Sequence, residues 1–97
     1  VVDDEPGVRL FCREVLQIDG LLCHDADSVE AGLAKAREHL PDLVLIDVNL
    51  GAVPGTELLR QLRESPPAPH LKVIMISGAA SVDRLLTNAA GHREVTP

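Results

Sequence analysis

The chain has 97 residues, of which 45% are hydrophobic and 25% are charged, and its net charge is -6. This length and composition predict one globular domain over residues 1–97 rather than a disordered segment. The lysines and arginines are scattered, so no basic stripe predicts nucleic-acid binding by this segment. No apolar run approaches the ~20 residues that cross a membrane, and no leader opens the chain. We therefore expect a cytoplasmic protein.

The first half of the chain predicts strands and helices in alternation. Residues 1–2 are the end of a strand, and a helix runs from Pro6 to about Ile18. Its apolar face holds Val8, Phe11, Cys12 and Val15. Residues 21–23 predict a short second strand, after which Ser28 caps a helix that ends before Pro41. We expect Cys12 and Cys23 to be core thiols.

The second half continues the same alternation. Residues 42–47 predict a central strand, because four consecutive apolar residues are typical of a strand covered on both faces. A loop with Gly51, Pro54 and Gly55 leads into a helix that carries Leu58, Leu59 and Leu62. Residues 65–69 are a proline-rich connector, residues 71–76 a strand and residues 82–89 a helix. The alternation predicts an α/β fold with three layers, in which helices cover both faces of a doubly wound parallel sheet.

Acidic or hydroxyl side chains follow three of the predicted strands. Asp3 and Asp4 follow residues 1–2, Asp47 closes the central strand, and Ser77 follows residues 71–76. Because the carboxyl ends of parallel strands meet at one edge, we expect these side chains to share a pocket. Two carboxylates ~4 Å apart at an effective dielectric constant near 20 repel by roughly 4 kcal/mol, so the cluster predicts a divalent cation. Alternatively, Asp3 and Asp4 only cap the first helix.

Four blocks of the sequence resemble the receiver domains of two-component response regulators. They are VVDDEP at residues 1–6, PDLVLIDVNL at 41–50, PGTELL at 54–59 and VIMISG at 73–78. The resemblance implies a flavodoxin-like fold, with a shortened first strand and an incomplete fifth strand and last helix. The beginning at Val1 and the short tail after Gly91 lead us to expect a partial receiver domain.

The resemblance also implies a chemistry. Asp47 would accept a phosphoryl group from a histidine kinase or phosphotransfer protein, and Ser77 would hydrogen-bond that group. Mg²⁺ would be bound by Asp4 and Asp47, by Asp3 mainly through water, and by the backbone carbonyl of Asn49. The phosphorylated domain would signal to an output domain outside this segment, and it would be no enzyme beyond slow self-dephosphorylation.

One part of the family pattern differs. Receiver domains carry a lysine before a proline on the fifth strand, where this chain has Thr96 before Pro97, and neither Lys35 nor Lys72 fits that place. Arg93 is a candidate replacement. A degenerate receiver, which binds partners without phosphorylation, therefore remains an alternative. A haloacid-dehalogenase-like phosphohydrolase is a third hypothesis, against which Asn49 stands where those enzymes have an acid.

Overall fold

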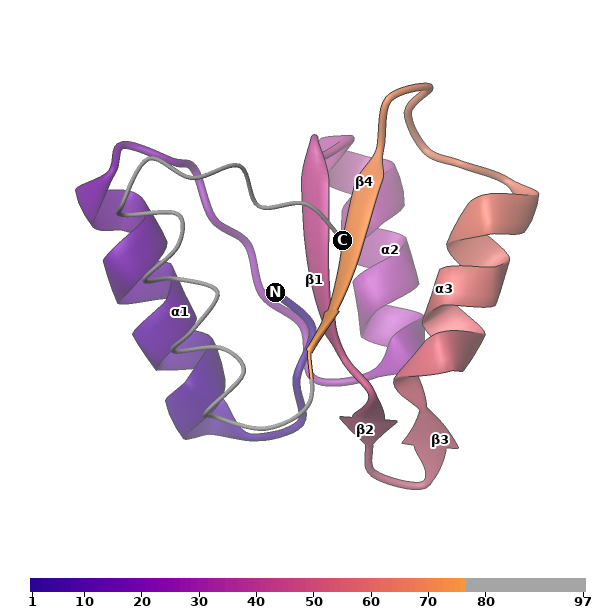
Figure 1. Ribbon diagram of the computed structural model, residues 1–97, viewed down its shortest axis with the longest axis horizontal. Helices are drawn as coiled ribbons and strands as arrows, with labels where there is room; N and C mark the ends of the chain where they lie inside the picture. Colours follow the sequence, from indigo (N-terminus) through magenta and orange to yellow (C-terminus); the bar gives the residue numbers. More distant parts are fainter. Residues whose placement is uncertain (77–97) are drawn as a thin grey trace.

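The computed structural model describes residues 1–76. Its elements are α1 (Pro6–Ile18), α2 (Val29–His39), β1 (Leu43–Asp47), β2 (Asn49–Leu50), β3 (Val53–Pro54), α3 (Gly55–Glu64) and β4 (Lys72–Ile76). Helix α1 lies on one side of the β1–β4 pair, and α2 and α3 lie on the other (Figure 1). Ser77, the helix predicted at 82–89, the fifth strand and Arg93 lie outside the described residues.

The sheet is parallel, as predicted. Strands β1 and β4 pair in register from Leu43 opposite Lys72 to Asp47 opposite Ile76. Val2 forms parallel bridges to Ile46 on one side and to Ala26 on the other. The order across the sheet is therefore Ala26, Val2, β1 and β4, with β1 in a central position. Helices on both faces of this sheet confirm the three-layer α/β fold.

The continuous apolar run of β1 is explained by its two buried faces. Val44 and Ile46 belong to one hydrophobic cluster with residues of α2 and α3, such as Leu58. Leu45 belongs to a second cluster with Cys12 of α1. Alternate side chains of one strand thus enter opposite layers, and neither face is left for polar residues.

The helix predictions are largely confirmed. Helix α1 has the predicted bounds, with Pro6 in its first turn. The Ser28 hydroxyl accepts a hydrogen bond from the Ala31 N–H at 3.2 Å, which caps α2 as expected. Both cysteines are buried free thiols. Phe11 was wrongly placed on the apolar face of α1: its exposed fraction is 44%, because Val8, Cys12, Val15 and Leu16 are the residues that pack against the sheet.

The predicted strand at residues 21–23 is wrong. This segment of the chain joins the sheet only at residues 24–26. The Val1 nitrogen donates to the His24 carbonyl at 2.9 Å, and the Ala26 N–H donates to the Val1 carbonyl at 2.9 Å. Within residues 1–76, residues 21–23 make no sheet pairing, and the first residue of this segment that bridges to the sheet is Ala26, opposite Val2. Leu21 and Leu22 are exposed, at 53% and 86%.

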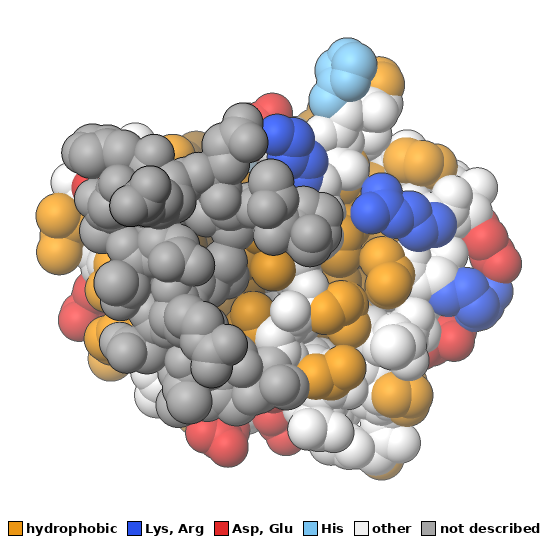
Figure 2. Space-filling view, viewed as in Figure 1, with side chains coloured by type: hydrophobic (Ala, Val, Ile, Leu, Met, Phe, Trp, Pro, Cys, Tyr) orange, Lys and Arg blue, Asp and Glu red, His pale blue; other side chains and the backbone are white. Residues whose placement is uncertain are grey.

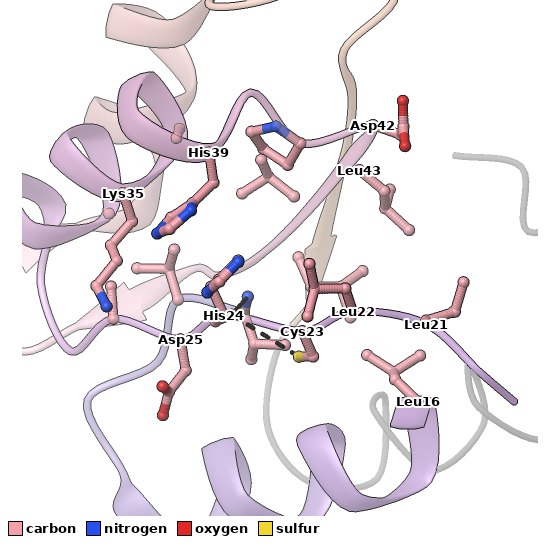
Figure 3. Close-up of a pocket in the computed structure, with 18 of the residues that line it drawn as sticks. Leu16, Leu21, Leu22, Cys23, His24, Asp25, Lys35, His39, Asp42 and Leu43 are labelled. Atoms are coloured by element: carbon pink, nitrogen blue, oxygen red, sulfur yellow. Dashed lines mark hydrogen bonds between the residues drawn. The ribbon is translucent and has the colours of Figure 1, made fainter. Parts of the chain in front are cut away.

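An apolar cavity of about 320 Å³ lies beside this segment. It is lined by residues 21–26, the end of α2 and the beginning of β1 (Figure 3). The rings of His24 and His39, which both line it, stack with their centroids 3.6 Å apart. Val1 and Val2 also line the cavity. The cavity lies at the amino end of β1, opposite to the end that carries Asp47.

Two surface properties relate to the expected partners. On the face shown in Figure 2, the Lys and Arg side chains of the described part are separated by other side chains and form no continuous stripe. Among the helices that the structure describes, none is both long and apolar enough to cross a membrane.

Candidate functional site

Backbone pairing places three aspartates together at the carboxyl end of the sheet. The Val2 N–H donates to the Leu45 carbonyl at 2.8 Å, and the Asp47 N–H donates to the Val2 carbonyl at 2.9 Å. This register sets Asp3 and Asp4, which follow Val2, beside the end of β1. One carboxylate oxygen from each of Asp3, Asp4 and Asp47 lies within 4.8 Å of the other two. The three residues predicted to share a pocket are therefore brought together.

Asp3 is a buried acid of the cluster with a raised pKa. Its exposed fraction is 3%, and its Oδ1 accepts a hydrogen bond from the Glu5 N–H at 2.8 Å. Burial is the main cause that raises its pKa to about 6, and the charges of Asp47 and Asp4 raise it further, while the Glu5 N–H opposes the shift. The carboxylate is thus held in a site that disfavours its own negative charge.

Asp47 is buried, with an exposed fraction of 7%, whereas Asp4 is exposed. The Oδ1 of Asp47 accepts a hydrogen bond from the Asn49 N–H at 3.0 Å, which fixes the orientation of the carboxylate. Buried Asp3 and Asp47 therefore form the floor of the cluster, and Asp4 lies at its entrance. Hard carboxylate oxygens that converge in this way suit a cation such as Mg²⁺.

A short hairpin after β1 forms one wall of the site. The sequence predicted only a loop here, but β2 and β3 pair antiparallel, with Asn49 opposite Pro54 and Leu50 opposite Val53. Gly51, in the turn, has φ of +68°, and a β carbon built on it would lie 3.8 Å from Asp4 Oδ2. The hairpin was missed because two-residue strands are too short to show alternation.

The hairpin also bears on the predicted role of Asn49. Proline has no N–H, so Pro54 cannot donate a hydrogen bond to the facing Asn49 carbonyl. The Asn49 carbonyl thus receives no hydrogen bond from Pro54. The Asn49 N–H, by contrast, donates to Asp47 Oδ1. Ser77, the remaining predicted site residue, lies outside the described residues.

Sequence reasoning missed Arg9, which lies next to the acid cluster. Its Nη1 donates to the backbone carbonyl of Asp3 at 2.7 Å, and its Nε donates to Asp25 Oδ2 at 3.2 Å. The signal that could have found it is its place in the first turns of α1, because helical side chains point back toward the helix N-terminus. Here that direction leads to Asp3.

The fold agrees with comparisons with known proteins. The family description "Response regulator receiver domain" matches residues 1–92. The KDP operon transcriptional regulatory protein KdpE of Escherichia coli (strain K12) is 30% identical over 91 residues, which are 94% of this chain and 40% of KdpE. The response regulator GacA of Pseudomonas viridiflava is 43% identical over 79 residues, which are 79% of this chain and 36% of GacA. The chain thus spans about two fifths of the length of these relatives.

Solved structures give the same result. The receiver domain of NtrX from Brucella abortus matches with a TM-score of 0.72 and 26% identity, over 95% of this chain and 77% of that structure. The MaeR response regulator bound to beryllium trifluoride matches with a TM-score of 0.63 and 28% identity, over 94% of this chain and 73% of that structure. Because the family match covers nearly the whole sequence, the chain belongs to the response regulator receiver domains.

Proposed function

We propose that Asp47 accepts a phosphoryl group from a phosphohistidine of a histidine kinase or phosphotransfer protein, in a reaction that requires Mg²⁺. The observation that carries this proposal is the convergence of three carboxylates, within 4.8 Å of one another, at the carboxyl end of a parallel sheet. A cluster with this much negative charge is suited to neither anion binding nor a dry core. It is suited to a cation that also binds a phosphoryl group.

In this proposal each residue of the site would have a defined role in binding Mg²⁺. Asp4 and Asp47 would bind Mg²⁺ through carboxylate oxygens, Asn49 through its carbonyl, and Asp3 mainly through water. The ion, when bound, neutralises negative charge on the cluster and on the incoming phosphoryl oxygens. The hydrogen bond from the Asn49 N–H would hold the Asp47 carboxylate in one orientation during the transfer.

The transfer itself needs little more than position and charge. An oxygen of the Asp47 carboxylate forms a bond to phosphorus while the bond between phosphorus and the donor imidazole nitrogen breaks, and the imidazole leaves as a neutral group after it takes up a proton. Ser77, which follows β4, would donate its hydroxyl hydrogen to a phosphoryl oxygen. The structure solved for MaeR with beryllium trifluoride supports the proposal, because this anion is a chemical analogue of a phosphoryl group on a carboxylate.

We further propose that residues 1–97 are one partial receiver domain, located in the cytoplasm, that signals to an output domain outside this segment. The relatives KdpE and GacA support an output domain outside this segment, since the chain matches only about two fifths of each. In this arrangement the domain is a signalling module rather than an enzyme. It would lose its phosphoryl group only by slow hydrolysis, and it would not itself bind nucleic acid.

The proposal is tested by the intact mass of the folded protein after incubation with Mg²⁺ and acetyl phosphate. Asp47→Asn, in which an amide replaces the nucleophilic oxygen, is measured alongside. We expect the parent to gain one phosphoryl group and the variant to gain none. A labelled Asp47→Asn variant would show that Asp47 is not the acceptor.

A degenerate receiver is the second candidate. The observation in its favour comes from residues 1–76, whose two lysines both lie away from Asp47: Lys72 begins β4 at the far end of the sheet, and Lys35 lines the cavity at that same end. Neither can neutralise a phosphoryl group on Asp47. If the parent is folded but gains no phosphoryl group, a module that binds partners without phosphorylation becomes the better proposal.

A further inference from the structure

Arg9 connects helix α1 to Asp3, beside the acid cluster, and to Asp25, in the segment before α2. It lies in α1, it binds the Asp3 carbonyl at 2.7 Å, and it binds Asp25 at 3.2 Å in the segment before α2. Only 18% of its side chain and 26% of that of Asp25 are exposed. Figure 3 shows Asp25 directed away from the cavity, on the side where α1 lies. The ion pair is therefore partly buried and held between two elements, unlike a pair that is free in solvent.

The contact completes the anchoring of the Asp3 peptide. The Asp3 N–H donates to the Ala26 carbonyl at 3.0 Å, the carboxylate accepts from the Glu5 N–H at 2.8 Å, and the carbonyl accepts from Arg9. The carbonyl of Asp3 belongs to the peptide bond that leads into Asp4. A bond at this carbonyl therefore fixes the plane from which the exposed Asp4 carboxylate projects toward Asp47.

The charge of Arg9 has the wrong sign to help a cation bind. A guanidinium close to a cation site repels the cation, so by Coulomb's law its removal should tighten Mg²⁺ binding. A positioning effect acts in the opposite direction, because removal of the hydrogen bond lets the Asp3–Asp4 peptide move away from the geometry that Mg²⁺ requires. The sign of the change in Mg²⁺ affinity on removal of Arg9 therefore distinguishes the electrostatic effect from the positioning effect.

We propose that Arg9, held by Asp25, is a positioning residue that sets the Asp3–Asp4 peptide for Mg²⁺ binding. This inference rests on the proposed function, since it assumes that the acid cluster binds Mg²⁺. Arg9 acts on the metal only through the backbone of Asp3. Loss of Arg9 should lower the affinity of the site for Mg²⁺ without removing any carboxylate from it.

The test is calorimetric titration of Mg²⁺ into the parent, Arg9→Met and Arg13→Met. Arg13 is a matched control, because its Nη1 contacts the same Asp25 at 3.4 Å while, within residues 1–76, it makes no hydrogen bond to Asp3. We expect Arg9→Met to weaken Mg²⁺ binding about 10-fold, as is typical when a partner of a metal ligand is removed. Arg13→Met should stay within about 2-fold of the parent or bind slightly tighter.

Arg9→Lys is the second variant and gives an answer even if Arg9→Met does not fold. It keeps the positive charge, but one ammonium group cannot reproduce the two bonds in the geometry of the guanidinium. We expect it to bind Mg²⁺ severalfold more weakly than the parent, with far-UV circular dichroism showing both to be folded.

The outcomes separate the inference from the proposed function. If the parent binds Mg²⁺ and the folded Arg9 variants bind it equally or more tightly, the positioning role is overturned while the proposed site stands. If the folded parent binds no Mg²⁺, the proposed function fails, and the positioning role fails with it. Equal weakening by Arg13→Met would also overturn the inference, since the effect would then come from Asp25 alone.

Discussion

Gly55 is the position near the site at which an added methyl group should lower the stability of the fold most. It is the first residue of α3, and its N–H donates to the Val48 carbonyl at 2.8 Å. A β carbon built on Gly55 would lie 1.9 Å from the Asp47 carbonyl oxygen and 3.0 Å from Ile46 Cγ2. Ordinary van der Waals contact begins at 3.4 Å, so Gly55→Ala must move the helix and the strand apart by about 1.5 Å.

The opposing contributions can be compared. Alanine in a helix is favoured over glycine by about 0.5–1 kcal/mol. Overpacking costs about 1–3 kcal/mol, and here the partner is a backbone carbonyl that cannot rotate away. Loss of the bond from Gly55 to Val48 adds about 1 kcal/mol. We expect Gly55→Ala to lower the free energy of unfolding by about 3 kcal/mol. At an unfolding entropy of about 2.1 cal/mol/K per residue, this lowers Tm by roughly 15 °C.

The assay is urea unfolding followed by far-UV circular dichroism in EDTA, because the chain has no Trp or Tyr for fluorescence. Gly7→Ala is the matched control: it also lies in the first turn of a helix, but a β carbon there meets nothing within 4 Å. The control should be neutral or up to about 1 kcal/mol more stable. If Gly55→Ala is as stable as Gly7→Ala, the close approach of α3 to Asp47 is not a constraint, and the reasoning fails.

Two further predictions concern the cap of α2 and the acid cluster. Ser28→Ala removes the bond to the Ala31 N–H and should lower the free energy of unfolding by about 1 kcal/mol, without changing Mg²⁺ affinity. Asp3 has a folded-state pKa of about 6 against an ordinary value of 3.8, so its contribution to stability is fully present below pH ~4 and is lost as the pH rises through 6. In EDTA, the free energy of unfolding of the parent relative to Asp3→Asn should fall by about 1 kcal/mol between pH 5 and pH 7. A relative stability that does not change with pH would show that Asp3 is not strained in the folded protein.

The helices and the main strands could be predicted because each leaves a local signal in the sequence. A proline in the first turn and regular apolar spacing define α1, and the Ser28 cap defines the beginning of α2. The four apolar residues of β1 indicate a strand with two buried faces, which the two hydrophobic clusters confirm. These signals are short-range, so no knowledge of tertiary contacts was needed to read them.

The errors arose where long-range pairing decides the structure. Residues 21–23 have the composition of a strand, but the residue of this segment that pairs with the sheet is Ala26, which bridges to Val2. The β2–β3 hairpin forms around the Gly51 turn, although each strand has only two residues. Phe11 of α1 is a similar case. The apolar spacing predicts which face of the helix is apolar, but it does not predict which residues at the edge of that face are covered by neighbouring elements.

The acid cluster could be predicted although its residues are up to 44 positions apart, because parallel strands carry their carboxyl ends to one edge regardless of sequence distance. The same rule could not identify Arg9 or Gly55, which depend on how closely two helices approach that edge. The aspartate carboxylates supply the negative charge of the site. The guanidinium of Arg9 and the lack of a side chain at Gly55 determine where these carboxylates lie. If the proposed function is right, sequences that keep the aspartates but alter Arg9 or Gly55 should retain the acidic pocket and lose Mg²⁺ affinity. The chemistry of the site would then be encoded by its acids and its geometry by residues that never touch the ion.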